Sequence, residues 1–561
     1  MSDDAPENTE GGQERHSPLA LTASHSAAAA VTGRLNTSPE GTTAPWLVAP
    51  VVAMAAFMEV LDISIANVSL QHISGDLAAS QDESTWVLTS YLVTNAIVLP
   101  ISGWLASVIG RKRLFISCIV GFSIASLLCG LAPNLEMLIL FRAIQGLTGG
   151  GLQPLSQSIL ADSFPPKQRG MAFALFGIAV VFAPAIGPTL GGWITDTSSW
   201  RWVFLLNVPV GIILTILLST MIQDSPELVK ARLAKLKQGL RLDYLGFALI
   251  TLGFGCLQVV LDKGQEDDWL ESSFIVWMCI ISVVSLIAFA IWELGQDDPI
   301  VDLRLLADRN FLFANILMFV LGFVLLGSTV LLPELVQLLL GYTATDAGLV
   351  LTPGGFAIMA LMPLIGRMVS TMDSRHMIAF GLTTCALALF HMTTFDLYTD
   401  YNTFMWGRIY QACGLAFLFI PINTAAFRGI APQKSAAASA IINVSRNIGG
   451  SVGISLVTTE LAQMSQVHQT FLVAHASMLN LAYRDTLSRL SSLFHLHGDV
   501  TSSAQLKAAG EIFTMINQQA SMQAFLDGFK LLGITMIVLA PFVYVMRSAT
   551  MQNRGGGGGA H

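Results

Sequence analysis

Apolar residues gather in fourteen long blocks along this chain, and polar segments separate the blocks. Each block is about 18 to 25 residues long, roughly the length of a helix that crosses the hydrocarbon core of a bilayer. A soluble protein of this length would instead show short amphipathic segments. The pattern therefore predicts an all-α integral membrane protein, with spans near residues 46–70, 86–106, 113–131, 136–160, 171–195, 203–222, 243–262, 273–292, 313–333, 345–367, 376–394, 403–425, 436–460 and 528–547.

Composition supports the same class of protein. Charged residues make up only 12% of the 561 residues, whereas about 25% is usual in a soluble domain. No basic cluster with interleaved aromatic residues indicates nucleic-acid binding. The cysteines all fall inside predicted spans, where we interpret them as small buried apolar residues rather than as a disulfide framework or a metal site. They are Cys118, Cys129, Cys256, Cys279, Cys385 and Cys413.

Basic residues concentrate in alternate short loops between the spans. The other short loops contain only Arg201 and Lys263. Because basic loops stay on the cytoplasmic side, the first set is predicted to be cytoplasmic. An even number of spans then places both termini in the cytoplasm. The cytoplasmic set comprises Arg111, Lys112 and Arg113; Lys167 and Arg169; Lys230, Arg232, Lys235, Lys237 and Arg241; Arg304 and Arg309; Arg367 and Arg375; and Arg428 and Lys434.

A weak internal repeat divides the chain. The stretch Gly103–Lys112 recurs as Gly366–Arg375, and Arg142–Gln145 recurs as Arg408–Gln411. Transporters use such repeats to build two lobes around a central site. We therefore predict two six-helix lobes and two inserted helices. The N-terminal lobe covers 45–222, a cytoplasmic loop 223–242, the inserted helices 243–292 and the C-terminal lobe 293–547.

Three segments lie outside this plan. Residues 1–44 are rich in Ser, Thr, Ala and Gly and bury too little apolar surface to fold, so they are predicted to be a disordered cytoplasmic tail. Residues 548–561 form a Gly-rich cytoplasmic tail. Residues 461–527 form a polar, helix-prone periplasmic loop, much longer than the other connections. This loop is either a docking element or a tolerated insertion.

Two acids in the first span are candidates for proton coupling. Glu59 and Asp62 are three residues apart and therefore share one helical face. Glu59 would lie roughly 20 Å along the helix from Trp46, near the middle of the bilayer. Burial there favours the neutral form of a carboxyl group, as a proton carrier requires. The alternative is a structural carboxylate that binds another helix.

Span 4 contains Arg142, with Gln145 and Gly146 on the same face. A guanidinium keeps its charge when buried, so Arg142 cannot carry the proton. It could hold a neighbouring carboxylate ionised, or it could be a static strut between helices.

Proline and glycine in span 5 predict a bending element, because proline removes a backbone donor and glycine allows close packing. The residues concerned are Pro184, Gly187, Pro188, Gly191 and Gly192. GxxxG pairs at Gly146 with Gly150, Gly187 with Gly191, and Gly449 with Gly453 predict tight helix contacts.

Four polar residues of the second lobe are candidates for substrate binding or for bridges between helices. They are Glu334, Gln337, Arg408 and Asn423.

The sequence contains no enzyme motif in the structural context that its chemistry would require. Gly449–Gly453 matches a GxSxG nucleophile motif but lies in an apolar helix rather than on a strand-turn-helix. No GxxxxGK[ST], HExxH or paired CxxC occurs. We therefore predict a protein that is not an enzyme, has no metal or cofactor, and uses a proton gradient as its energy source.

Several of these motifs resemble those of the major facilitator superfamily, over nearly the whole chain. Gly103–Arg113 resembles its signature between spans 2 and 3, Leu138–Gly151 its span-4 signature, and Gly177–Gly192 its span-5 antiporter signature. Leu61–Val68 and Trp200–Pro209 are similar to the fourteen-span drug:proton antiporter (DHA2) branch. The resemblance implies the major facilitator fold.

The resemblance also assigns roles. It implies that Gly103, Gly110 and Arg111 belong to a conformational motif, and it makes Asn67 a substrate-binding candidate. At Ser107 the chain departs from the signature, which usually has Asp there. That departure puts in doubt a charged latch between spans at this position.

A drug:proton antiporter of this kind would export hydrophobic or amphipathic drugs across the bacterial inner membrane. The resemblance further implies a tripartite system with an EmrA-like periplasmic adaptor and a TolC-like outer-membrane channel. The alternatives are proton-coupled transport of a specific metabolite or fatty acid, and a receptor or scaffold that does not transport.

Overall fold

The computed structural model describes residues 45–547, except residues 223, 225, 238–242, 298 and 498. The predicted tails 1–44 and 548–561, and Arg241 of the predicted cytoplasmic loop, lie outside the described residues. Helices and short 3-10 turns account for all the regular structure in the described range, which contains no strand. The all-α fold class predicted from the sequence is therefore confirmed.

The first lobe is built from nine described helical segments, of which α3 and α9 are short connections. In chain order they are α2 (Pro45–Val68), α3 (Leu70–Asp76), α4 (Gln81–Ile109), α5 (Arg111–Gly130), α6 (Leu135–Gly149), α7 (Leu152–Ser163), α8 (Arg169–Thr197), α9 (Arg201–Leu205) and α10 (Asn207–Met221), where α9 and α10 together cover the sixth predicted span.

The fourth predicted span is divided where three glycines follow one another. Helix α6 ends at Gly149 and α7 begins at Leu152. Glycine costs about 1 kcal/mol in a helix interior relative to alanine, and Pro154 has no N–H to donate one turn back. The break points α7 toward the second lobe, which it contacts through α18.

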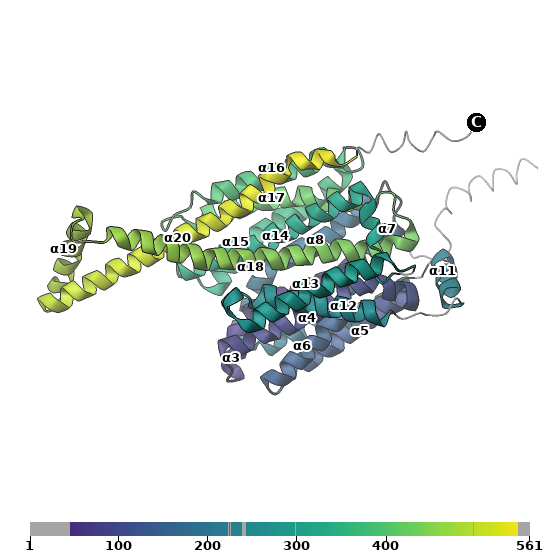
Figure 1. Cartoon of the computed structure of the whole chain (residues 1–561), viewed down its shortest axis with the longest axis horizontal. Helices are drawn as coiled ribbons and strands as arrows, with labels where there is room; N and C mark the ends of the chain where they lie inside the picture. Colours follow the sequence, from purple (N-terminus) through teal and green to yellow (C-terminus); the bar gives the residue numbers. More distant parts are fainter. Residues whose placement is uncertain are drawn as a thin grey trace, which may run out of the picture. The chain divides into compact units, whose positions relative to one another are not determined.

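The inserted pair consists of α12 (Tyr244–Lys263) and α13 (Ser273–Leu294), which lie side by side (Figure 1). Helix α11 (Pro226–Lys237) precedes the pair, and the 3-10 turns η1 (Trp269–Glu271) and η2 (Leu303–Ala307) flank α13. Helix α12 also packs on α4 and on α18, whereas α13 packs mainly on α12. The pair is therefore attached to the lobes by α12.

The second lobe follows with longer helices. They are α14 (Arg309–Leu338), α15 (Ala344–Met368), α16 (Ser374–Met392), α17 (Tyr401–Ala426), α18 (Ser435–His475), α19 (Leu481–Leu496) and α20 (Thr501–Leu539), with 3-10 turns η3 (Pro432–Lys434) and η4 (Pro541–Val545). Side-chain caps mark some of the helix starts, as where Asp308 accepts a hydrogen bond from the N–H of Phe311 at 2.9 Å.

Most of the long loop predicted at 461–527 is helical. Helix α18 continues through its start to His475, and α20 begins at Thr501, well before the last predicted span. Together with α19 they form a projection at one end of the helices in Figure 1. Gln, Ala, Leu and Met are good helix formers, so the helices continue where the apolar pattern ends.

Eleven helices in the described part of the chain are long and apolar enough to cross a membrane. Helices lie over all fourteen predicted spans, but three of these spans are not among the eleven. The fourth is divided into α6 and α7, and α16 and α18 are more polar than the rest. The chain is a multi-pass membrane protein, and the count of fourteen spans stays a prediction.

Glycines set the closest helix contact in the second lobe, between α14 and α18. A β-carbon at Gly449 would overlap the carbonyl oxygen of Phe319, and one at Gly453 would overlap that of Phe323. From the other side, a β-carbon at Gly322 would overlap the carbonyl oxygen of Arg446. The tight packing expected for this GxxxG pair is therefore present between α14 and α18.

Replacing Gly449 with Ala should therefore destabilise the protein. The added methyl group meets backbone, which cannot rotate away, and overpacking of this kind costs about 1–3 kcal/mol. We expect a lower apparent melting temperature of the purified protein. Gly510→Ala in α20 is the matched control, because nothing lies within 4 Å of its added β-carbon. Equal melting temperatures for the two variants would contradict the close contact.

Candidate functional site

An ion pair between α2 and α6 lies inside the first lobe. The Nη1 atom of Arg142 is 2.6 Å from Oδ2 of Asp62, and both side chains are fully buried. The guanidinium lies over the ring of Tyr91, 4.3 Å from its centroid, and its Nε donates to the carbonyl of Val87 at 3.1 Å. Each charge supplies the other's counter-charge in an environment without water.

Two amides complete the hydrogen bonding of Asp62. Gln145 and Asn207 both donate to Oδ1, at 3.0 and 2.7 Å. Both amides also donate to the hydroxyl of Ser126. Asp62 therefore accepts hydrogen bonds from three donors of α6 and α10, which connect α2 to both helices.

Glu59 lies one turn before Asp62 but has a different environment. Its Oε1 accepts a hydrogen bond from Asn95 at 3.0 Å, and its Oε2 is buried without a hydrogen-bond partner. Glu59 is only 1% exposed and takes part in no ion pair with another described residue. A single hydrogen bond does not compensate for removing a charged carboxylate from water. A neutral carboxylic acid at the same place needs fewer hydrogen-bond partners.

A cavity of about 360 Å³ lies beside these residues. Its wall comes from α2, α4, α6, α7 and α8 of the first lobe, α12 of the inserted pair, and α14 and α18 of the second lobe. Most of the wall is apolar, with Val, Ile and Leu side chains. Its polar groups include Asn67, Asn95, Gln153, Gln258, Asp262 and Arg446. Apolar walls with a few polar groups are typical of sites for amphipathic ligands.

Helix α7 joins the lobes at three levels. Gln153 accepts a hydrogen bond from Arg446 at the cavity. One turn further, Gln157 accepts from Asn443 at 2.6 Å and also binds Asn423. At the end of the helix, Asp162 accepts from Ser435 of α18 at 2.7 Å.

The signature between α4 and α5 is held at the predicted cytoplasmic end. Arg111 forms an ion pair with Asp162 and donates to Ser435 at 3.2 Å. Ser107, where the family pattern has Asp, donates to the carbonyl of Trp104 in its own helix at 2.7 Å. Asp162, which the sequence reading did not single out, thus supplies the acid that links this motif to the second lobe.

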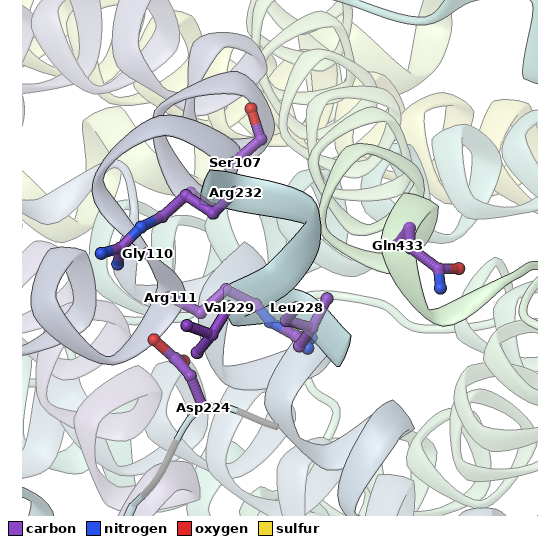
Figure 2. A pocket seen from close by; sticks show the side chains of 9 residues that line it. Ser107, Gly110, Arg111, Asp224, Leu228, Val229, Arg232 and Gln433 are labelled. Atoms are coloured by element: carbon purple, nitrogen blue, oxygen red, sulfur yellow. The ribbon is translucent and has the colours of Figure 1, made fainter. Parts of the chain in front are cut away.

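Helix α11 covers the same motif (Figure 2). Arg232 donates to the carbonyl of Ile109 at 3.0 Å, and Asp224 accepts from the N–H of Lys112 at 3.2 Å. Gly110 between them has φ +97°, and a β-carbon there would lie 2.5 Å from Nη1 of Arg232. Only glycine fits this turn.

Gly187 and Gly191 of α8 face α2, whereas the nearest atoms to a β-carbon at Gly192 belong to Thr345 of α15. A β-carbon at Gly187 would overlap the hydroxyl of Ser64, and one at Gly191 would lie 2.9 Å from Cγ2 of Ile65. Pro184 lines the cavity. Helix α8 is continuous through Pro184 and Pro188, so the bending role of this motif, including Gly192, stays a prediction.

Two further glycines of the motifs allow close helix approaches. A β-carbon at Gly146 would overlap the carbonyl oxygen of Tyr91, and one at Gly103 would lie 2.8 Å from the α-carbon of Ala437.

The substrate-binding candidates are scattered. Asn67 lines the cavity. Glu334 is half-buried and Gln337 exposed near the end of α14, and neither is part of the cavity wall. Asn423 is fully buried in the contact with α7 described above. Arg408 is also buried away from the wall, where it donates to Ser328 at 3.0 Å and to Gln411 at 2.7 Å.

Sequence reasoning missed several residues of the wall. Arg446 lies within the predicted span 436–460, so the rule that singled out Glu59 also applies to it. Asp262 lies at the end of the seventh predicted span. Asn95, Gln153 and Gln258 are single amides in apolar helices, and only their contacts separate them from ordinary helix bridges.

Comparisons with known proteins identify the family of the chain. Residues 52–454 match the model of the Major Facilitator Superfamily. The chain is 36% identical over 511 residues to the multidrug export protein EmrB of Escherichia coli K12, across 91% of this chain and 96% of EmrB. It is 37% identical over 511 residues to the fatty acid resistance protein FarB of Neisseria gonorrhoeae, across 90% and 96% of the two chains.

Solved structures show the same fold at low sequence identity. The proton:xylose symporter XylE of E. coli superposes with a TM-score of 0.57 and 14% identity, over 90% of this chain and 96% of XylE. At this identity the likeness supports the fold alone.

The buried ion pair predicts coupled effects of substitution. Arg142→Ala leaves the carboxylate of Asp62 buried without a cation, which should cost about 3–5 kcal/mol of stability. Adding Asp62→Asn removes the orphaned charge, so the double variant should be more stable than Arg142→Ala alone. A thermal double-mutant cycle on purified protein measures this coupling. Additive losses would mean that the two charges do not depend on each other.

Proposed function

Since the chain belongs to the major facilitator superfamily, we propose that it is a multidrug efflux transporter that exports amphipathic compounds in exchange for protons. Its relatives include the multidrug export protein EmrB of E. coli. The cavity wall is mostly apolar and has few polar groups, which favours substrates that differ in shape but share an amphipathic character.

The contrast between Glu59 and Asp62 carries the proposal of proton coupling. Asp62 has an ion pair and two further donors, whereas Glu59 has one hydrogen bond and one buried oxygen without a partner. Protonation of Asp62 would weaken its contacts with three buried donors, whereas protonation of Glu59 would disturb only one. We assign the exchanged proton to Glu59, and we assign Asp62 and Arg142 to holding α2 against α6.

Asn95 connects the proton to the exported compound. Its amide donates to Oε1 of Glu59, and the same side chain lines the cavity. A compound that fills the cavity changes the water and the hydrogen bonds available to Asn95, and hence the balance between the two forms of Glu59. Binding of a proton and of the compound then influence each other in both directions.

Export of fatty acids is a second candidate. FarB, a fatty acid resistance protein, is 37% identical to this chain. Arg446 lines the cavity, donates to Gln153 and Asn447, and forms no ion pair with a described residue. Arg446 interacts electrostatically with Glu59 but has no hydrogen-bonded carboxylate among the described residues. Such a buried guanidinium is suited to bind the carboxylate of an acid. Laurate and a neutral drug of similar size, tested side by side, separate this function from general drug export.

We propose the bacterial inner membrane as the location, with both termini in the cytoplasm and α19 in the periplasm. In that orientation, the projection formed by α19 and the adjoining ends of α18 and α20 would meet a periplasmic adaptor. Leucines on it are strongly exposed: Leu479 is 96% and Leu496 84% exposed. Exposed apolar side chains on a polar helix support a docking element of a tripartite system with an EmrA-like adaptor and a TolC-like channel.

Neutralising Glu59 should uncouple transport. In liposomes with an imposed pH gradient, the wild type should concentrate a fluorescent drug about tenfold per pH unit if one proton is exchanged. Glu59→Gln should show no gradient-driven accumulation but should still exchange drug across the membrane without a gradient. Glu136→Gln, at the exposed start of α6, is the matched control. Gradient-driven accumulation by Glu59→Gln would refute the assignment.

Replacing residues 478–499 by a short Gly-Ser linker tests the docking element. Purified protein should keep its proton-driven transport, because no residue of α19 lines the cavity. Whole-cell drug resistance should fall, since compound released into the periplasm re-enters the cell. Crosslinkers on α19 should capture the adaptor, and crosslinkers on α11 should not. Full resistance without an adduct would identify the loop as a tolerated insertion.

A further inference from the structure

The inserted helix pair contributes to the central cavity through α12. Gln258 and Asp262 are four residues apart on one face of this helix, and both line the cavity. No residue of α13 is on the wall. The two inserted helices therefore do more than fill space beside the lobes, since one of them presents polar groups to whatever occupies the cavity.

Asp262 is the only acid among the described residues of the wall. The hydroxyl of Thr89 on α4 donates to its Oδ2, and its Oδ1 receives no hydrogen bond from a described residue. No ion pair within the described part of the chain includes Asp262. The neighbouring Lys263 binds Glu266 and the hydroxyl of Thr85 instead. One carboxylate oxygen thus remains available to a ligand.

Contacts from both lobes fix the position of Asp262. Thr89 belongs to the first lobe, and Ser451 of α18 in the second lobe donates to Oε1 of Gln258 at 3.1 Å. The side of α12 that carries Asp262 is therefore oriented before any compound arrives, which lowers the entropy cost of binding.

The carboxyl group of Asp262 is open to the cavity. Unlike Glu59, which is fully buried, its side chain is half-buried on the wall, so a cationic group in the cavity can reach it and supply its counter-charge. The two arginines on the wall differ in their partners: Arg142 is neutralised by Asp62, and Arg446 binds neutral amides. The ring of Tyr91 is already covered by the guanidinium of Arg142. Asp262 is thus the negative feature that the wall offers.

We propose that Asp262 binds the cationic group of positively charged amphipathic compounds, so that the inserted helix pair sets the charge preference of the cavity. This inference rests on the proposed function, because it assigns the cavity to the exported compound. It adds a residue of the inserted pair to the binding site and separates recognition of the cation, at Asp262, from proton exchange, at Glu59.

Two ions of matched size and opposite charge test the proposal. Tetraphenylphosphonium and tetraphenylborate are titrated into the purified full-length protein in lipid nanodiscs. Asp262→Asn should weaken binding of the phosphonium about tenfold, the loss expected for one partly hydrated ion pair. Binding of the borate should stay equal or become tighter. Asp262→Glu keeps the charge and should retain the preference for the phosphonium.

Val180→Ala on α8 is the matched control, because it changes the wall of the same cavity without changing charge or any contact that Asp262 makes with a described residue. It should alter the affinities for the two ions by the same factor. Equal losses for both ions in Asp262→Asn, or unchanged binding of the phosphonium, would overturn the inference and leave the proposed function intact. A wild-type protein that binds neither ion would contradict both. Glu59→Gln should keep the charge preference, and its loss there would mean that cation and proton share one site.

Discussion

A carboxylate and a guanidinium that are buried together must supply each other's counter-charge, and the arrangement around the cavity depends on this pairing between Asp62 and Arg142. The ion pair connects α2 to α6, and the amides of Gln145 and Asn207 donate hydrogen bonds to the other oxygen of the Asp62 carboxylate. With Asp62 satisfied, Glu59 one turn away is left with a single donor. Two acids on one helical face therefore differ in chemistry because only one of them faces the arginine.

The second lobe repeats this network without its acid. Ser328, Arg408 and Gln411 each lie 266 residues after Asp62, Arg142 and Gln145. Arg408 donates to the hydroxyl of Ser328 where Arg142 meets a carboxylate, and it binds Gln411 as Arg142 binds Gln145. The repeat kept the geometry of a strut in both lobes. Among the described residues, a carboxylate paired with this arginine occurs in the first lobe alone, so the two networks share a geometry but differ in charge.

The sequence predicted the helices well and the site in part. Apolar blocks mark most helices because side chains that face lipid are apolar. The division between α6 and α7 lies at three consecutive glycines, and an average of hydropathy over a long window does not detect it. Glu59, Asp62 and Arg142 were found because a charge in an apolar span is rare. Gln153 and Asn95 were missed because an amide side chain in a span often only forms a hydrogen bond between helices, and the sequence does not distinguish this role from ligand binding. Glu334 was singled out by charge although its helix directs it away from the wall.

The three levels of contact along α7 have a mechanical consequence. No ion pair within the described residues joins the lobes there; hydrogen bonds from Gln153, Gln157 and Asp162 do. A hydrogen bond of this kind contributes about 0.5–1.5 kcal/mol net, or up to about 3 kcal/mol where one partner is charged, because water replaces the lost partner. The lobes also meet at α8 and α15, where Gly170 and Gly366 let the two backbones pack closely, and water cannot replace contacts of that kind. The seam along α7 is thus the part of the contact between the lobes that can be hydrated without breaking close packing.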